Sequence, residues 1–191
     1  MNKAPTFATL ASSNHSKSTR EENDFYATEP KATELLLEVE KFSKDIWECA
    51  NGKSHISNVL EKHGYRVWKT DIIDRGYEDD IIDFLTSNIK FNGDIITNPP
   101  YVSCASFVEK ALDSVEKGHK VAMFVKLLFL EGKSRKKLFM ENPPKTVYVS
   151  SSRLNCARNG DFEKYKSSSV AYAWFVWEKG YKGNTIIKWI N

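Results

Sequence analysis

The stretch DIITNPPYVS, residues 94–103, joins a short apolar run to a carboxamide, two prolines and a phenol. Asn92-Gly93 precedes the apolar run and the diproline follows it, a pattern typical of a buried β-strand that ends abruptly. Two successive prolines remove two N–H donors and fix φ at about −65°, so the turn after Asn98 is stiff. The sequence therefore places a rigid polar turn at a strand end.

A turn of this composition suits an amino group on a flat heteroaromatic ring. Asn98 offers a side-chain carbonyl, Pro99 a backbone carbonyl, and Tyr101 a ring face for stacking. Two acceptors on one amine oppose delocalisation of the nitrogen lone pair and make the nitrogen a better nucleophile. A bare diproline can be a simple strand terminator, but the flanking Asn98 and Tyr101 favour a binding site.

Outward from this stretch, apolar residues alternate between helical and strand-like spacing. Helices are expected over 30–42, 55–64 and 106–118, and strands over 45–50, 65–73, 79–85, 92–100 and 119–130. Alternation of strand and helix predicts an α/β domain with a parallel sheet. The segments 145–154, 168–180 and 184–191 follow without long helices, which predicts antiparallel pairs at the C-terminal side of the sheet. Residues 155–168 are expected to form a surface loop.

The composition describes one domain. A chain of 191 residues with 41% hydrophobic content can build a single core. Residues 1–23 are polar and are expected to form a flexible tail before a domain at 24–191. No apolar run approaches the roughly 20 residues that span a bilayer, so we expect a cytoplasmic protein without membrane contact.

Metal and disulfide chemistry are not expected. The three cysteines, Cys49, Cys104 and Cys156, form no CxxC pair, and their number is odd. Cys104 follows the diproline turn and is assigned to packing. The formal net charge of +3 permits a polyanionic partner without requiring one.

Ligands of open parallel sheets bind beyond the carboxyl ends of the strands, and three such ends here suit adenosine. The loop from Glu48 to Ser54 contains small residues that let backbone N–H groups approach a ligand. Asp71, about 20 residues further on, can accept hydrogen bonds from both ribose hydroxyls. Asp83 can accept from an exocyclic amine, and Phe84 can stack on a purine. Only Gly52 is present of the three glycines that a pyrophosphate loop needs, which disfavours a dinucleotide.

The motif NPPY at 98–101 resembles the catalytic signature of the amino-methyltransferases, most often the N6-adenine DNA methyltransferases. The span from DFYATEP (24–30) to the C-terminus resembles small phage- and prophage-type members of that family. The resemblance implies a Rossmann-like class I methyltransferase fold, S-adenosylmethionine as cofactor and DNA as partner. It implies catalytic roles for Asn98, Pro99, Pro100 and Tyr101, and cofactor binding by Tyr26, Thr28, Pro30, Glu48, Ala50, Gly52, Asp71, Asp83 and Phe84.

Two departures from the family pattern stand out. Ser54 occupies the place of a second loop glycine, where a side chain can crowd the cofactor if the position needs positive φ. The second departure is size: we expect no separate target-recognition domain, and therefore a specificity that is short or loose or supplied by a partner, on DNA that can be single-stranded. Phosphate contacts are predicted at Lys126, Arg153 and Arg158, with Phe162 beside them.

The residues of the turn 98–101 do not distinguish adenine from several other methyl acceptors. The same turn suits N4 of cytosine, an RNA base or the side-chain amide of a protein glutamine. Methylation of a paired base requires its extrusion from the stack, at a cost of a few kcal/mol. An alternative that is not an enzyme is a catalytically silent nucleic-acid-binding protein. Ser54 in the cofactor loop and the lack of a recognition domain favour this interpretation.

Overall fold

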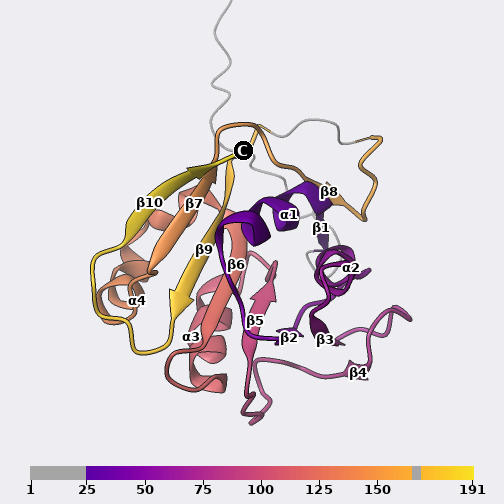
Figure 1. The fold of residues 1–191 in the computed structure, drawn as a ribbon, viewed down its shortest axis with the longest axis horizontal. Coiled ribbons are helices and arrows are strands. Elements are labelled where there is room, and N and C mark those ends of the chain that lie inside the picture. The colour runs from indigo at the N-terminus through magenta and orange to yellow at the C-terminus, as the bar shows by residue number, and fades with distance from the viewer. Residues whose placement is uncertain (1–24, 165–168) are drawn as a thin grey trace, which may run out of the picture.

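The computed structural model describes residues 25–164 and 169–191, so the predicted tail at 1–23 lies outside the described residues. Its centre is an eight-stranded sheet with the order β10-β7-β9-β6-β5-β2-β3-β4 (Figure 1). The strands β2 to β6 pair in parallel, and β9 is antiparallel to both of its neighbours, β6 and β7. The predicted class, a mostly parallel α/β sheet with antiparallel pairing on the C-terminal side, is confirmed.

The helices and strands follow the alternation of the sequence. The strands are β1 (Tyr26–Thr28), β2 (Asp45–Glu48), β3 (Arg66–Asp71), β4 (Asp80–Ile81), β5 (Asp94–Thr97), β6 (Lys120–Lys126), β7 (Thr146–Ser150), β8 (Cys156–Arg158), β9 (Tyr172–Glu178) and β10 (Ile186–Ile190). The helices are α1 (Pro30–Val39), α2 (His55–Lys62), α3 (Cys104–Ser114) and α4 (Lys136–Glu141), with 3-10 helices at Leu127–Leu130 and Lys133–Arg135.

Helices cover both faces of the sheet. Leu36 of α1 and Leu60 of α2 belong to one apolar cluster, which reaches Trp174 of β9. Phe107 of α3 and Leu138 of α4 belong to a second cluster on the other face. The indole of Trp174 also donates to the Ala32 carbonyl at 2.7 Å, which ties α1 to the sheet. A sheet covered on both faces leaves the strand ends as the place for a ligand.

Three local expectations need correction. The strand expected over 119–130 ends at Lys126, because the chain turns into the 3-10 helix Leu127–Leu130. The surface loop expected over 155–168 contains β8, which pairs with β1 in a separate two-stranded sheet. The outermost strand β10 runs parallel to β7, so the antiparallel pairing at this side is confined to β9.

Two properties of the described residues bear on function. None of their helices is long and apolar enough to cross a membrane. Across 25–164 and 169–191, no group of three or more His, Cys, Asp or Glu side chains is arranged to hold a metal ion. Within the same ranges the three cysteines are free thiols, and Cys104 is buried in the core as predicted.

Candidate functional site

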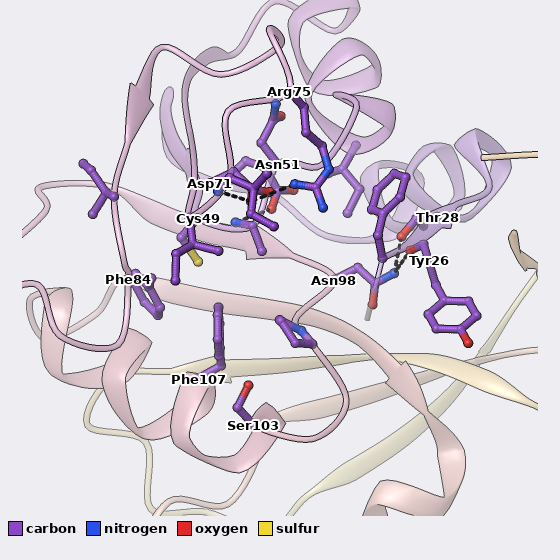
Figure 2. Close-up of a pocket in the computed structure, with 18 of the residues that line it drawn as sticks. Tyr26, Thr28, Cys49, Asn51, Asp71, Arg75, Phe84, Asn98, Ser103 and Phe107 are labelled. Carbon is purple, nitrogen blue, oxygen red and sulfur yellow. Dashed lines mark hydrogen bonds and ion pairs between the residues drawn. The ribbon is translucent and has the colours of Figure 1, made fainter. Parts of the chain in front are cut away.

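A pocket opens at the carboxyl ends of β2, β3 and β5, with β1 at its edge (Figure 2). Parallel pairing brings these ends together, although the residues are far apart in sequence. Of the predicted cofactor residues, those that line the pocket are Tyr26, Thr28, Glu48, Ala50, Asp71, Asp83 and Phe84. Pro30 begins α1 and lies outside the lining. Gly52 also lies outside it, although it shapes the loop.

The loop after β2 is held by its own hydrogen bonds. The Asn51 amide nitrogen donates to the Ser54 hydroxyl at 2.9 Å and to the Tyr77 carbonyl at 3.0 Å. Its oxygen accepts from the Ser57 hydroxyl at 2.7 Å. Gly52 has φ of 58°, and an added Cβ would lie 2.3 Å from the Phe25 ring, so only glycine fits there.

Ser54 adopts the left-handed conformation that the sequence analysis considered, with φ of 61°. Its side chain is buried and does not line the pocket. The hydroxyl instead lies 3.2 Å from the Tyr77 carbonyl, to which it donates. The serine thus stabilises the loop from outside the pocket rather than crowding the ligand space.

The Asp71 carboxylate is anchored at the pocket rim. Its Oδ2 accepts from the Gly52 N–H at 2.8 Å, and its Oδ1 accepts from the Ile73 N–H at 3.0 Å. Arg75 approaches Oδ1 at 3.3 Å, and its guanidinium also lies over the Phe25 ring, 5.0 Å from the centroid. These bonds fix the position of the carboxylate at the pocket rim.

Glu48 lies at the bottom of the pocket and is only 1% exposed. Burial, with a smaller contribution from repulsion by Asp71, raises the pKa of this carboxyl to about 8. Its Oε1 accepts from the Ala50 N–H at 3.2 Å. A buried acid next to a second carboxylate is a site for a cationic ligand group.

Asn98 stands at the mouth of the pocket with a fixed side chain. Its amide nitrogen donates to the Tyr26 carbonyl at 2.8 Å and to the Thr28 hydroxyl at 3.0 Å. Figure 2 shows the amide oxygen turned away from both of these partners. Two donated bonds fix the orientation of the amide, so its oxygen is presented as an acceptor.

Pro100 and Tyr101 of the diproline turn line two different hollows. Pro100 lines the pocket beside Asn98, whereas Tyr101 does not and lines a second hollow instead. The Tyr101 ring stacks on Tyr26, with centroids 5.7 Å apart, and Lys126 Nζ lies 4.6 Å from its centroid. Burial raises the pKa of its phenol well above the usual value. In this conformation, Tyr26 and Lys126 occupy the surroundings of the ring predicted to receive a base.

Comparison with known proteins gives structural matches only. No protein-family model matches the chain, and no curated sequence matches it significantly. A Listeria monocytogenes protein provisionally assigned to the class I S-adenosylmethionine-dependent methyltransferases superposes with a TM-score of 0.56 at 13% identity, over 82% of this chain and 62% of that chain. The M protein of the type I restriction enzyme EcoKI gives 0.54 at 14%, over 81% and 44%. A Pyrococcus horikoshii protein provisionally described as an RNA methyltransferase gives 0.52 at 12%, over 78% and 79%.

The chain has the class I methyltransferase fold. At these identities the likeness establishes the architecture and not the reaction. The chain also spans less than two thirds of the length of the first two structures.

Within the class I methyltransferase fold, the predicted phosphate contacts are scattered. Lys126 ends β6 beside Tyr101, whereas Arg153 is exposed after β7. Arg158 lies in β8 opposite Tyr26. The Phe162 ring packs edge-on against His55, 5.6 Å between centroids; His55 lines the pocket and Phe162 lies behind it, outside the lining. These four residues do not form one cluster.

Sequence reasoning missed several lining residues: Phe25, Asn51, His55, Arg75, Ser103 and Phe107. Asn51 and His55 belong to the loop and helix after β2, so their position next to Glu48 was a usable signal. Phe107 lies in the helix predicted over 106–118, and it both packs on Phe84 and lines the pocket. Arg75 follows β3 in an irregular segment whose path no periodicity predicts.

Proposed function

We propose that the chain is an S-adenosylmethionine-dependent methyltransferase that modifies the exocyclic N6 of adenine in DNA. The observation that carries this proposal is the fixed Asn98 amide. Its nitrogen donates to two groups of β1, its oxygen is presented as an acceptor, and the adjoining pocket is lined by three carboxyl groups, those of Glu48, Asp71 and Asp83. An acceptor so placed suits an aryl amine that must reach an electrophile in the pocket.

The lining residues fit S-adenosylmethionine. Glu48 matches the ammonium of the methionine part, because a buried carboxylate with a raised pKa gains from a cationic partner. Asp71 matches the ribose hydroxyls, and Asp83 with Phe84 matches the adenine. The bound cofactor would supply an electrophilic methyl on a sulfonium.

The chain's own residues then position the acceptor. Asn98 Oδ1 would accept one hydrogen bond from the amine, and the carbonyl of the buried Pro99, which lies outside the pocket lining, would have to accept the second; together they would direct the nitrogen lone pair out of the ring plane. The nitrogen so held would take the methyl group that the bound cofactor supplies, S-adenosylhomocysteine would be the leaving group, and the surplus amine proton would pass to solvent. No covalent enzyme intermediate is needed. Cys104, the thiol nearest in sequence, is buried, and burial raises its pKa to about 12.

The structural neighbours support a nucleic-acid acceptor. One of them is the M protein of a type I restriction enzyme. Another is an archaeal protein provisionally described as an RNA methyltransferase. The pattern NPPY at 98–101 favours an aryl amine as methyl acceptor. Its two carbonyls can accept hydrogen bonds from both amine N–H groups, but neither is a base that could remove the proton of a hydroxyl group.

Transfer of tritium from methyl-labelled S-adenosylmethionine tests the proposal. The purified protein is incubated with duplex DNA, single-stranded DNA, RNA and a glutamine-containing peptide. We expect acid-insoluble label in DNA from the wild type and none from Asn98→Ala. Binding of S-adenosylhomocysteine without label in any acceptor would indicate a silent nucleic-acid-binding protein and contradict the proposal.

A further inference from the structure

The 3-10 helix Leu127–Leu130 exposes aliphatic side chains beside the diproline turn. Phe129 points inward and is 8% exposed, whereas Leu128 is 65% and Leu130 42% exposed. Phe129 packs edge-on against Phe139 and Phe175, which anchors the segment in the core. Leu128 and Leu130 together leave apolar surface beside the turn that a partner could cover.

The segment is held rigidly in this arrangement. The Arg135 guanidinium donates to the Phe129 carbonyl at 2.8 Å and to the Leu128 carbonyl at 3.3 Å, and it also bonds the Glu131 carbonyl. Gly132 has φ of 129°, and an added Cβ would lie 2.8 Å from Arg135. The half-buried Arg135 guanidinium thus holds three backbone carbonyls of the segment, and Leu128 projects outward from it.

This segment lies next to Tyr101, away from the cofactor pocket. Tyr101, Lys126 and Leu128 line one hollow, while Pro100 lines the pocket. Val102, which follows Tyr101, is 74% exposed. Apolar side chains therefore adjoin the turn that would receive the extruded base.

The 3-10 helix and the residues that follow it carry several basic side chains. Residues 126–137 contain five basic residues (Lys126, Lys133, Arg135, Lys136 and Lys137) and one acidic residue, Glu131. Lys133 and Lys136 are exposed, and neither has an ion pair among the residues that the structure describes. Lys137 lies 3.9 Å from Glu141, and both side chains are well exposed, so this pair neutralises little. Phosphates are the complementary partner for such a surface.

We propose that residues 127–137 form the surface that docks duplex DNA, with Lys133 and Lys136 on phosphates and Leu128 inserted in the base stack. This rests on the proposed function for the choice of partner. Apolar wedges are used to unstack duplex steps, and methylation of a paired adenine leaves a gap that a side chain must fill. Leu128 is exposed, rigid and adjacent to the turn, which are the three properties that such a wedge needs.

The wedge is tested by the ratio of methyl transfer on a duplex to that on the same strand unpaired. Leu128→Ala lowers this ratio about tenfold, because filling the gap matters only when a base leaves a stack. Val39→Ala, which truncates a 46% exposed side chain on α1, leaves the ratio unchanged. An unchanged ratio for Leu128→Ala would overturn the wedge, as would an equal loss on both substrates.

The phosphate contacts are tested by binding alone, which needs no catalysis. Fluorescence anisotropy of a labelled duplex is measured at several salt concentrations for the wild type and Lys133→Gln/Lys136→Gln. The slope of log K against log salt is negative, and each lost phosphate contact makes it shallower by about 0.9. For the double variant we therefore expect a slope shallower by about 1.8. The control Lys62→Gln/Lys117→Gln removes two exposed lysines elsewhere and keeps the slope.

The two proposals fail separately. A reduced slope without methyl transfer from the wild type would retain the docking surface and reject the proposed reaction. A wild-type slope in Lys133→Gln/Lys136→Gln would reject the docking surface even if methyl transfer is observed. A reduced slope on duplex RNA but not on duplex DNA would reject the choice of partner.

Discussion

The two sides of the turn 98–101 are built differently. On one side, which we call the polar side, the carboxyl groups of Glu48 and Asp71 lie at the ends of parallel strands within an otherwise largely apolar pocket. On the other side, the hollow beside Tyr101 is formed by the 3-10 helix Leu127–Leu130 and by Arg135. The first side follows from sheet geometry, whereas the second depends on how an irregular segment folds back.

This difference separates two tasks. The polar side has fixed carboxylates, as expected for a small charged ligand that must be held in one orientation. The other side has exposed leucines and lysines without strong partners, as expected for a surface that meets a large polyanion. Substitutions on the two sides should therefore affect different measurements.

The largest effect is expected at the boundary between the sides. Asn98→Ala should lower methyl transfer about 10²- to 10³-fold, because it removes an acceptor used on the reacting amine. Binding of S-adenosylhomocysteine, measured by calorimetry, should stay within a few-fold. Since Asn98 also bonds β1, thermal unfolding of the variant serves as the control. Turnover close to that of the wild type would reject the role of Asn98.

On the polar side, Asp71→Asn should weaken cofactor binding about tenfold to a hundredfold. Hydrogen bonds to a charged acceptor contribute about 1.5–3 kcal/mol, and asparagine removes the charge. The variant keeps an oxygen for the Gly52 N–H, which limits damage to the loop. Calorimetry with S-adenosylhomocysteine gives the dissociation constant, and a wild-type value would count against Asp71 as a ligand.

The pH dependence of cofactor binding tests Glu48. With its pKa raised to about 8, the empty site holds a proton at neutral pH, and a cationic ligand group must displace that proton. Affinity should rise with pH from about 6 to about 7.5, by up to about tenfold per pH unit. Calorimetry in buffers of different ionisation enthalpy should detect proton release in the wild type and none in Glu48→Gln. Equal heats in all buffers for the wild type would contradict this assignment.

The smallest effect is expected for Ser54→Gly. Glycine relieves a left-handed conformation that costs about 1–2 kcal/mol but loses hydroxyl bonds of about 1 kcal/mol each. The free energy of unfolding should change by about 1 kcal/mol or less, as chemical denaturation can show. Cofactor affinity should stay within about threefold, since the side chain lies outside the pocket. A tenfold gain in affinity would show that Ser54 crowds the ligand.

Much of the fold and of the polar side could be predicted from the sequence. Helical and strand periodicities locate α1 to α3 and β2 to β6, and the parallel sheet then brings the strand ends together. Asp71 and Asn98 follow from that rule because each lies at a strand end.

The remainder depends on contacts between distant segments. The pairing of β1 with β8 joins residues about 130 positions apart, so the local spacing of apolar residues does not predict it. Tyr101 stacks on Tyr26 of β1, a contact between residues 75 positions apart that local periodicity does not predict either. The 3-10 helix Leu127–Leu130 continues an apolar run that reads as strand, and its outward leucines depend on the bonds of Arg135.

Identification of the methylated nucleoside tests the central claim most directly. A duplex containing adenine and cytosine is methylated by the wild type, digested to nucleosides and examined by mass spectrometry. We expect N6-methyldeoxyadenosine, and its loss when adenine is replaced by purine, which lacks the exocyclic amine. Methyl groups on N4 of cytosine, on a ring carbon or on no nucleoside at all would contradict the account.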